Sequence, residues 1–311
     1  MSTVDSSEQR GILVIGAGEL GGSVLDALSR HDDAGALTAL LRPSTTPQGT
    51  ALRADLADRG VAVVEADVAT VPVTELADLL RPFHTVVSCV GFAAGRGTQR
   101  KLTDAALQAR VLRYVPWQFG VDYDVIGRGS PQDLFDEQLD VRDVLRGQTT
   151  TEWVIVSTGM FTSFLFEPSF GVVDAATRTV NALGSWDTEV TVTTAEDIGV
   201  LTAKILMTRP MIANDVVYVA GDTITYGELA DIVDRVGGAA VTRNLWTVPY
   251  LLDEVDCNPD DAIRKYRAVF ARGIGVAWPK ATSYNGICAM STVSAEQWAR
   301  DHLASGTSAE A

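Results

Sequence analysis

The sequence predicts an α/β protein in which a doubly wound parallel sheet is followed by a smaller C-terminal α+β domain. Up to residue 157, short apolar runs alternate with stretches of helical periodicity, which is typical of βαβ units. After Gly159 the alternation stops, and aromatic, proline and glycine residues punctuate the chain. We therefore expect one domain at residues 1–159 and a second at 160–311, with some later segments returning to the first.

The expected elements of the first half follow one another at a regular pitch. Strands are expected at the apolar runs 11–15, 37–41, 61–65, 85–90, 112–116 and 153–157. Helices are expected at 21–30, 48–59, 73–81, 98–109 and 133–146, and in the second half at 196–207 and 225–236. Because crossovers between parallel strands are right-handed, these helices should cover both faces of the sheet.

Composition excludes several classes of function. The 311 residues include 25 basic and 40 acidic side chains, and a net charge of −15 repels nucleic-acid phosphates. Three scattered cysteines are too few for a disulfide framework, and no His, Cys or Asp cluster has metal-ligand spacing. The most apolar stretch, residues 153–166, is too short and too polar to cross a membrane. Since the N-terminus lacks an apolar signal segment, we expect a cytoplasmic protein.

A glycine-rich turn follows the first expected strand. The run GAGELGG at residues 16–22 contains G-x-G-x-x-G between a buried strand and a helix, the context of a Rossmann dinucleotide site. The first glycine allows the tight turn, the second the approach of a pyrophosphate, and the third close packing of helix on strand. The free N–H groups of the helix start favour an anion. The residues expected at the cofactor here are Gly16, Gly18, Glu19, Leu20 and Gly21.

The end of the second strand indicates which dinucleotide binds. NAD sites carry Asp or Glu at this position to hold the ribose 2′-hydroxyl. Here the strand runs into Arg42-Pro43-Ser44-Thr45, with no acid. The guanidinium of Arg42 suits a phosphate, and Ser44 and Thr45 offer hydroxyl donors. The sequence therefore predicts NADP(H) rather than NAD(H); the alternative is an ordinary surface arginine.

Several segments, in order, resemble one known family. They are the glycine turn, Arg42, TVVSCVG at 85–91, Gln99 at a helix start, RYVPWQFG at 113–120 and EDIG at 196–199. With these segments the chain resembles the NmrA-like, isoflavone-reductase-like branch of the atypical short-chain dehydrogenases. The resemblance implies an NADPH-binding Rossmann domain, a C-terminal substrate domain and a cleft between them. Enzymes of the family reduce aromatic and phenylpropanoid-type compounds, whereas some relatives bind the dinucleotide only to sense redox state.

The expected cleft lies beyond the C-terminal ends of the strands, where open α/β sheets bind ligands. The side chains and backbone expected near the nicotinamide are Val90, Gly91, Phe92 and Gln118. An apolar wall for a flat substrate is expected from Trp117, Phe119, Met160 and Phe161. The alternative for each of these aromatic side chains is a place in the core.

The catalytic position departs from the family pattern. Reductases of this branch carry a Lys in a helix pattern like F-x-x-K-x-x-x-R, whereas Phe135–Arg142 places Gln138 there. An amide can position a carbonyl or a ribose by hydrogen bonding, but it cannot act as a tuned general acid. No tyrosine has a lysine four residues later, so the Tyr-x-x-x-Lys pair is absent too. Tyr123 is the candidate replacement proton donor, with water as the alternative.

Three functions remain open at this stage. The first is an NADPH-dependent reductase of an apolar, aromatic or conjugated small molecule, with Gln138 and Tyr123 as its catalytic residues. The second is a non-catalytic NADP(H)-binding regulator, which the missing Lys favours. The third is a non-redox rearrangement that keeps NADP as structure. Aromatic residues of the second half leave a homodimer open.

Overall fold

The computed structural model describes residues 11–303, whose contacts divide the chain into two compact units. The first, here called the sheet unit, holds the described part of Met1–Gln118 together with Glu137–Val156 and Ile198–Val217. The second unit holds Phe119–Asp136, Ser157–Asp197 and the described part of Tyr218–Ala311. A functional boundary near residue 159 stays a prediction.

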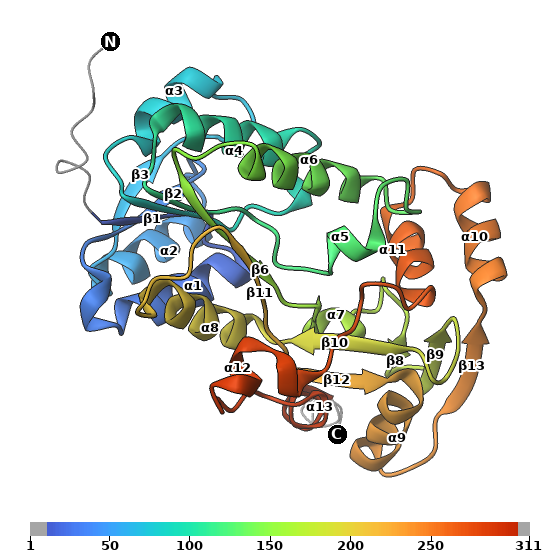
Figure 1. Ribbon diagram of the computed structural model, residues 1–311. Coiled ribbons are helices and arrows are strands. Elements are labelled where there is room, and N and C mark those ends of the chain that lie inside the picture. Colours follow the sequence, from blue (N-terminus) through green and yellow to red (C-terminus); the bar gives the residue numbers. More distant parts are fainter. Residues whose placement is uncertain (1–10, 304–311) are drawn as a thin grey trace. The chain divides into compact units, whose positions relative to one another are not determined.

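The sheet unit is built on a seven-stranded sheet in the order β11-β6-β5-β4-β1-β2-β3 (Figure 1). From β6 to β3, neighbouring strands pair in parallel, and Ile12 of β1 lies opposite both Leu37 of β2 and Thr85 of β4. The strand order reverses between β1 and β4, so the predicted doubly wound Rossmann fold is confirmed. The strands are β1 (Ile12–Ile15), β2 (Leu37–Leu41), β3 (Ala62–Glu65), β4 (Thr85–Ser88), β5 (Arg113–Val115), β6 (Glu152–Ser157) and β11 (Asp215–Tyr218).

Helices cover both faces of this sheet (Figure 1). One face carries α3 (Val73–Leu80), α4 (Thr98–Ala109) and α6 (Leu134–Arg146). The other face carries α1 (Glu19–Ser29), α2 (Pro47–Asp58) and α8 (Ala195–Met207). Two 3-10 helices, η1 (Asp32–Ala34) and η2 (Phe92–Ala94), lie in the connecting segments. A Cβ on Gly199 of α8 would lie 2.4 Å from the Ser23 carbonyl oxygen of α1, so these helices pack backbone to backbone.

The main core of the sheet unit lies between the strands and the α3, α4 and α6 layer. Its fully buried members come from all of these elements, because each helix buries one stripe and each central strand buries both faces. They include Leu13, Ile15, Leu76, Leu80, Val86, Leu102, Ala106, Tyr114, Val141, Leu145 and Ile155.

Local capping signals explain why helix boundaries follow the sequence closely. Thr46 accepts a hydrogen bond from the Gly49 N–H (3.1 Å) and is followed by Pro47 at the first helical position of α2. Thr225 and Glu228 form a reciprocal capping box at the start of α9 (Tyr226–Gly237). Both helices begin within one residue of the expected position.

The second unit contains two small sheets, β12-β10-β7 and β13-β9-β8. In the first, β10 pairs antiparallel with β12 and parallel with β7; in the second, β9 pairs parallel with β13 and antiparallel with β8. Its strands are β7 (Met160–Phe161), β8 (Val173–Asp174), β9 (Thr179–Leu183), β10 (Glu189–Thr193), β12 (Asp222–Thr225) and β13 (Thr242–Trp246). Its further helices are α5 (Tyr123–Ile126), α7 (Thr162–Leu165), α10 (Val248–Cys257), α11 (Ala262–Ala271), η3 (Lys280–Thr282), α12 (Tyr284–Ile287) and α13 (Ala295–Leu303).

A chain of aromatic rings runs through the second unit. The rings of Tyr123 and Phe135 are 4.9 Å apart, Phe135 and Tyr266 5.7 Å, and Tyr266 and Phe164 6.1 Å, all edge to face. Phe164 then stacks on the buried Phe170 at 4.4 Å. Edge-to-face and offset pairs at these spacings stabilise a core beyond the area that they bury.

The described residues hold neither a membrane-spanning helix nor a metal-binding cluster of side chains. Within residues 11–303, no helix is both long enough and apolar enough to cross a membrane. In the same part of the chain, no group of three or more His, Cys, Asp or Glu side chains could hold a metal ion.

The half-buried imidazole of His84, directly before β4, makes stability depend on pH. Burial, and then the Arg113 guanidinium, lower the pKa of His84 below its usual value. Since the unfolded chain takes up this proton more readily, the folded state should lose stability as pH falls below about 6.5. We expect the midpoint of urea unfolding to fall between pH 7 and pH 5, and to fall less in His84→Gln. His302→Gln, on the exposed side of α13, is the control; an equal pH response in both variants would refute the role of His84.

Candidate functional site

The turn between β1 and α1 brings helix and strand into close contact. Gly16 has a φ of +87°, which a residue with a side chain rarely adopts. A Cβ at Gly21 would lie 2.0 Å from the Gly16 carbonyl oxygen, so only glycine lets α1 pack on the end of β1 at this distance. The turn therefore has the geometry that the glycine pattern predicts.

The N-terminus of α1 is open on its outer side. Gly18 is the N-cap residue, and a Cβ built there would meet nothing within 4 Å. The first intrahelical bond runs from the Gly22 N–H to the Gly18 carbonyl (2.8 Å). The first turn of a helix presents backbone N–H groups ahead of this bond, and a helix start of this kind suits an anion. Their contact with a pyrophosphate stays a prediction.

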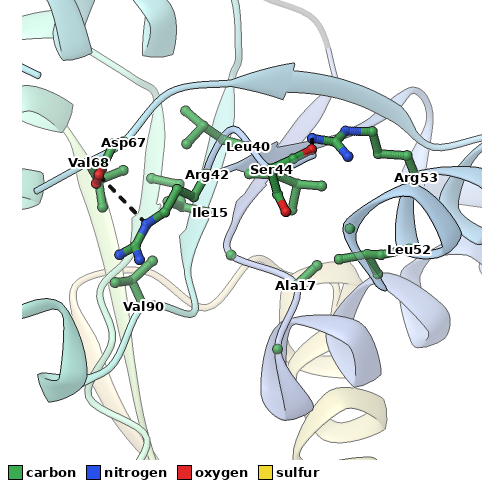
Figure 2. A pocket seen from close by; sticks show the side chains of 14 residues that line it. Ile15, Ala17, Leu40, Arg42, Ser44, Leu52, Arg53, Asp67, Val68 and Val90 are labelled. Atoms are coloured by element: carbon green, nitrogen blue, oxygen red, sulfur yellow. Dashed lines mark hydrogen bonds and ion pairs between the residues drawn. The ribbon is translucent and has the colours of Figure 1, made fainter. Parts of the chain in front are cut away.

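A cavity of about 550 Å³ opens beside this helix start, over the C-terminal ends of β1, β2 and β3. Figure 2 shows Arg42, Ser44 and Arg53 around it, with Ile15, Leu40 and Val68 forming an apolar floor. The complete lining is Ile15, Gly16, Ala17, Gly18, Leu40, Leu41, Arg42, Ser44, Gly49, Leu52, Arg53, Asp67, Val68 and Val90.

Arg42 and Arg53 enter this cavity with different partners (Figure 2). The Arg42 side chain is 67% exposed, and its Nε lies 3.7 Å from a carboxylate oxygen of Asp67, a loose ion pair. Arg53 donates from Nη2 to the Ser44 carbonyl oxygen and from Nε to Glu65, both at 2.7 Å. Arg53 thus holds the loop after β2 while Arg42 remains able to turn toward a ligand.

Arg53 and Asp67 were not among the residues predicted from the sequence. Arg53 lies on α2, and Asp67 follows β3, next to the end of β2 in the sheet. Asp67 follows a strand next to β2, and this position could have indicated it, since the ends of neighbouring parallel strands meet at one edge. Arg53 lies in the middle of α2 and carries no such signal.

The residues present fit the adenosine half of NADP(H). The open helix start suits a pyrophosphate, and the apolar floor suits an adenine ring. Arg42 at the end of β2 supplies a charged fork for a 2′-phosphate, where an NAD site has an acid. The Ser44 hydroxyl is a further donor, already within 3.0 Å of Thr46 Oγ1.

The ends of β4 and β5 form the other half of the site within the sheet unit. Val90 lines the cavity, and its side chain would be 3.2 Å from a Cβ at Gly16. Beyond it, Gly91 lies against Trp117, because a Cβ there would be 3.1 Å from the indole ring. Phe92 packs edge to face on Trp117, with ring centroids 4.6 Å apart. The structure thus brings these predicted residues together.

Gln118 is held inside the sheet unit by α6. Its side chain is fully buried, donates from Nε2 to the Gln138 carbonyl oxygen (2.9 Å) and accepts from Arg142 Nε (2.7 Å). Because both ends of the amide are engaged, the predicted contact of Gln118 with the cofactor stays a prediction. Its visible effect is to fix the register of α6 against β5.

Gln138 combines complete burial with unmet hydrogen-bonding capacity. The residue is 0% exposed, and neither Oε1 nor Nε2 has a hydrogen-bond partner among the described residues. A buried polar group without a partner destabilises a protein by about 1–3 kcal/mol. Both the donor and the acceptor of this amide could therefore bond a ligand atom, and its catalytic role stays a prediction.

The predicted residues of the second unit are mostly interior. Phe119 is 3% exposed, Tyr123 2% and Met160 4%, whereas Phe161 is half-buried. Their roles toward substrate and proton transfer stay predictions. Tyr266 carries a second phenol in this unit. Burial, and then the charge of Tyr123, raise the pKa of Tyr266 above its usual value.

Cys89, at the end of β4, is not poised for redox chemistry. Burial raises the pKa of its thiol, so the nucleophilic thiolate is disfavoured at neutral pH. The residue as a whole is only partly buried.

Comparison with known proteins gives a consistent family. The model of the NmrA-like family matches residues 8–273. A protein of Gibberella moniliformis (strain M3125 / FGSC 7600), named NmrA-like family domain-containing oxidoreductase, is 45% identical over 282 residues, which make up 88% of this chain and 92% of that protein. The resemblance noted from the sequence segments is thereby confirmed.

Solved structures share the fold at low sequence identity. Isoflavone reductase has a TM-score of 0.77 and 17% identity, covering 94% of this chain and 99% of its own. The leucoanthocyanidin reductase–NADPH complex from Vitis vinifera has a TM-score of 0.73 and 20% identity, covering 87% and 90%. An NADPH-dependent quinone oxidoreductase from Escherichia coli has a TM-score of 0.71 and 19% identity, covering 94% and 99%.

Arg42→Ala should weaken NADPH binding about tenfold and leave NADH binding nearly unchanged, since it removes one charged hydrogen-bonding partner of the 2′-phosphate. Calorimetric titration with both dinucleotides measures the ratio. Arg30→Ala, an exposed arginine paired with Asp26 on α1, is the matched control and should change neither affinity. Equal losses for NADPH and NADH would refute the assignment of Arg42.

Proposed function

The chain belongs to the NmrA-like family, and from that premise we propose that it is an oxidoreductase that uses NADPH to reduce an apolar, aromatic or conjugated small molecule. The observation that carries the proposal is the cavity in which an open helix N-terminus, an apolar floor and Arg42 lie together. NADPH supplies the hydride, and the protein supplies binding and orientation.

In this proposal the sheet unit orients the dinucleotide. The N–H groups at the start of α1 bind the pyrophosphate, and Arg42 binds the 2′-phosphate. The nicotinamide half then extends across the point of strand reversal toward the ends of β4 and β5. Val90, Gly91 and Phe92 would lie beside it, and the Gln138 amide would bond the ribose or a substrate carbonyl.

Proton delivery is assigned by elimination. The Gln138 amide can position a carbonyl oxygen but does not titrate near neutral pH. Tyr123 is therefore the proposed donor, and the Tyr266 phenol in the second unit interacts with it electrostatically. Water is the alternative proton source.

The aromatic content of both units supports the substrate class. Phe92 and Trp117 present rings beside the expected nicotinamide position, and Phe161 is half-buried in the second unit. Flat rings favour flat, conjugated substrates through stacking and edge contacts. The names of structural neighbours, which include an isoflavone reductase and a quinone oxidoreductase, point to the same chemistry.

A second candidate function is a dinucleotide-responsive regulator without turnover. The observation that favours it is Gln138, an amide where the reductases have a titratable lysine. In that case the Gln138 amide would bond the dinucleotide itself, and redox state would be read through a partner protein.

Oxidation of NADPH in the presence of quinones, enones, aldehydes and imines with aromatic rings separates the two functions. We expect loss of NADPH absorbance with at least one conjugated acceptor, faster than in an Arg42→Ala control at subsaturating NADPH. Tight NADPH binding without turnover on the whole panel would instead support the regulator. Failure to bind NADPH at millimolar concentration would refute both.

Gln138→Leu should separate stability from activity. Since the amide of Gln138 has no partner in the folded protein, replacing it with a similarly sized apolar group should leave stability unchanged or raise it by about 1 kcal/mol. Activity should fall about tenfold, because a hydrogen bond to the bound ligand is lost. Thermal unfolding and initial rates of NADPH oxidation measure the two effects.

The matched control is Gln132→Leu. Gln132 is equally buried, but its amide donates to the Ala262 carbonyl oxygen (3.1 Å) and accepts from the Leu134 N–H (3.4 Å). Its replacement should destabilise the protein, since it leaves those groups without partners. A Gln138→Leu variant that is both destabilised and fully active would contradict the proposed role.

A further inference from the structure

A carboxylate of α6 sits on the N-terminus of α4. One oxygen of Glu137 accepts from the Gln99 N–H (2.9 Å) and the Arg100 N–H (3.1 Å), and the other accepts from the Gly97 N–H (2.9 Å). All four residues belong to the sheet unit, as do α4 and the part of α6 from Glu137 onward. One side chain thus satisfies three backbone donors that lack intrahelical acceptors and adds a negative charge where the helix dipole favours one.

The sequence of α4 cannot provide this cap by itself. Its N-cap residue is Gly97, with a φ of +81° and no side chain to accept a hydrogen bond. The first intrahelical bond runs from the Lys101 N–H to the Gly97 carbonyl oxygen (2.9 Å). The start of α4 therefore depends on Glu137, which lies 40 positions after Gly97 in the sequence.

The segment between β4 and α4, residues 91–97, is held at its two ends. At the first end, Gln99 Nε2 donates to the Val90 carbonyl oxygen (2.7 Å), and at the second, Glu137 binds the Gly97 N–H. Between them Phe92 rests on Trp117, and Gly95 has a φ of +95°. Glycines at such angles bend easily, so the anchors determine where the segment lies.

Glu137 also precedes Gln138, whose carbonyl oxygen accepts from Gln118. The same turn of α6 is therefore bonded on one side to α4 and on the other to the end of β5. Moving Glu137 would shift both the 91–97 segment and the peptide that carries the buried Gln138 amide.

We propose that Glu137 is a positioning residue that holds the 91–97 segment and Gln138 in the arrangement that receives the nicotinamide half of the dinucleotide. The proposal rests on the proposed function for its ligand. It assigns Glu137 no contact with the cofactor: the residue acts through the backbone of Gly97 and through Gln138. The adenosine half binds over β1, β2 and β3 and should not depend on it.

The test compares two ligands that share the adenosine half. NADPH carries the nicotinamide, whereas adenosine 2′,5′-bisphosphate carries only the adenosine with its 2′- and 5′-phosphates. In Glu137→Gln, we expect the Kd for NADPH to rise about tenfold, since three charge-assisted hydrogen bonds that fix the segment are weakened. The Kd for the bisphosphate should change by less than about twofold, because its subsite lies apart from α6.

The sign of the effect separates positioning from simple electrostatics. Removing a negative charge would by itself strengthen the binding of both anions. Glu137→Asp keeps the charge but is one methylene shorter, so it should reproduce the NADPH-selective loss. Glu137→Asp with full NADPH affinity would overturn the proposal.

Glu228→Gln provides the matched structural control. Glu228 is a capping carboxylate at the start of α9 in the second unit, so its loss should lower thermal stability in the same way. Neither ligand should then bind more weakly. A loss of NADPH affinity in Glu228→Gln equal to that in Glu137→Gln would show a general effect of lower stability and overturn the proposal.

Hydrogen exchange gives a second measurement that needs no ligand. In Glu137→Gln, the amides of Gly97, Gln99 and Arg100 should exchange faster, while those of β1 and α1 keep their protection. Equal affinity losses for NADPH and the bisphosphate, or no change in either, would overturn the positioning role while leaving the proposed function intact. A wild-type protein that binds neither ligand would overturn the proposed function and the inference together.

Discussion

The close approach of α1 to β1 is the constraint on which the rest of the site depends. Gly21 can lie on the carbonyl of Gly16 only because Gly21 has no side chain, and Gly16 takes the positive φ of the turn. That contact places the start of α1 beside the cavity over β1, β2 and β3. A side chain at Gly21 would meet the Gly16 carbonyl oxygen, so the start of α1 could not keep this position.

The point where the strand order reverses separates two kinds of side chain in the candidate site. On the β2 and β3 side, the candidate site offers charged side chains such as Arg42, which is mostly exposed and held only loosely. On the β4 and β5 side, it offers buried amides and backbone carbonyls, fixed by Gln99, Gln118 and Glu137. The first arrangement suits a phosphate arriving from water; the second suits an uncharged ring that must be oriented.

The sheet unit could be predicted from the sequence because its signals are local. Apolar runs, capping residues and the glycine turn each act within a few residues, and the strands and helices lie where those signals put them. The contributions of Arg53, Asp67 and Glu137 could not be predicted in this way. Each depends on which strand or helix becomes its neighbour in the sheet, and that is decided by topology rather than by local sequence.

The second unit was harder to predict for a different reason. Its β7 and β8 contain two residues each, too short for a period-two pattern to be visible. In β10, Thr191 and Thr193 are fully buried. Polar residues thus occupy core positions that the usual alternation of apolar and polar residues would assign to solvent. Only α9, with its capping box and strong apolar stripe, carried a local signal clear enough to predict.

The inner face of α6 carries buried polar side chains at positions where packing alone would favour apolar ones. Val141 and Leu145 lie on it as an ordinary apolar stripe, and both are fully buried. One turn apart on the same helix, Gln138 and Arg142 are buried just as completely. Apolar side chains of similar size would cost nothing in desolvation at those positions, whereas a buried amide without a partner costs about 1–3 kcal/mol. The amide of Gln138 therefore has no partner in the fold that would explain it, and a hydrogen bond to a ligand is the role proposed for it.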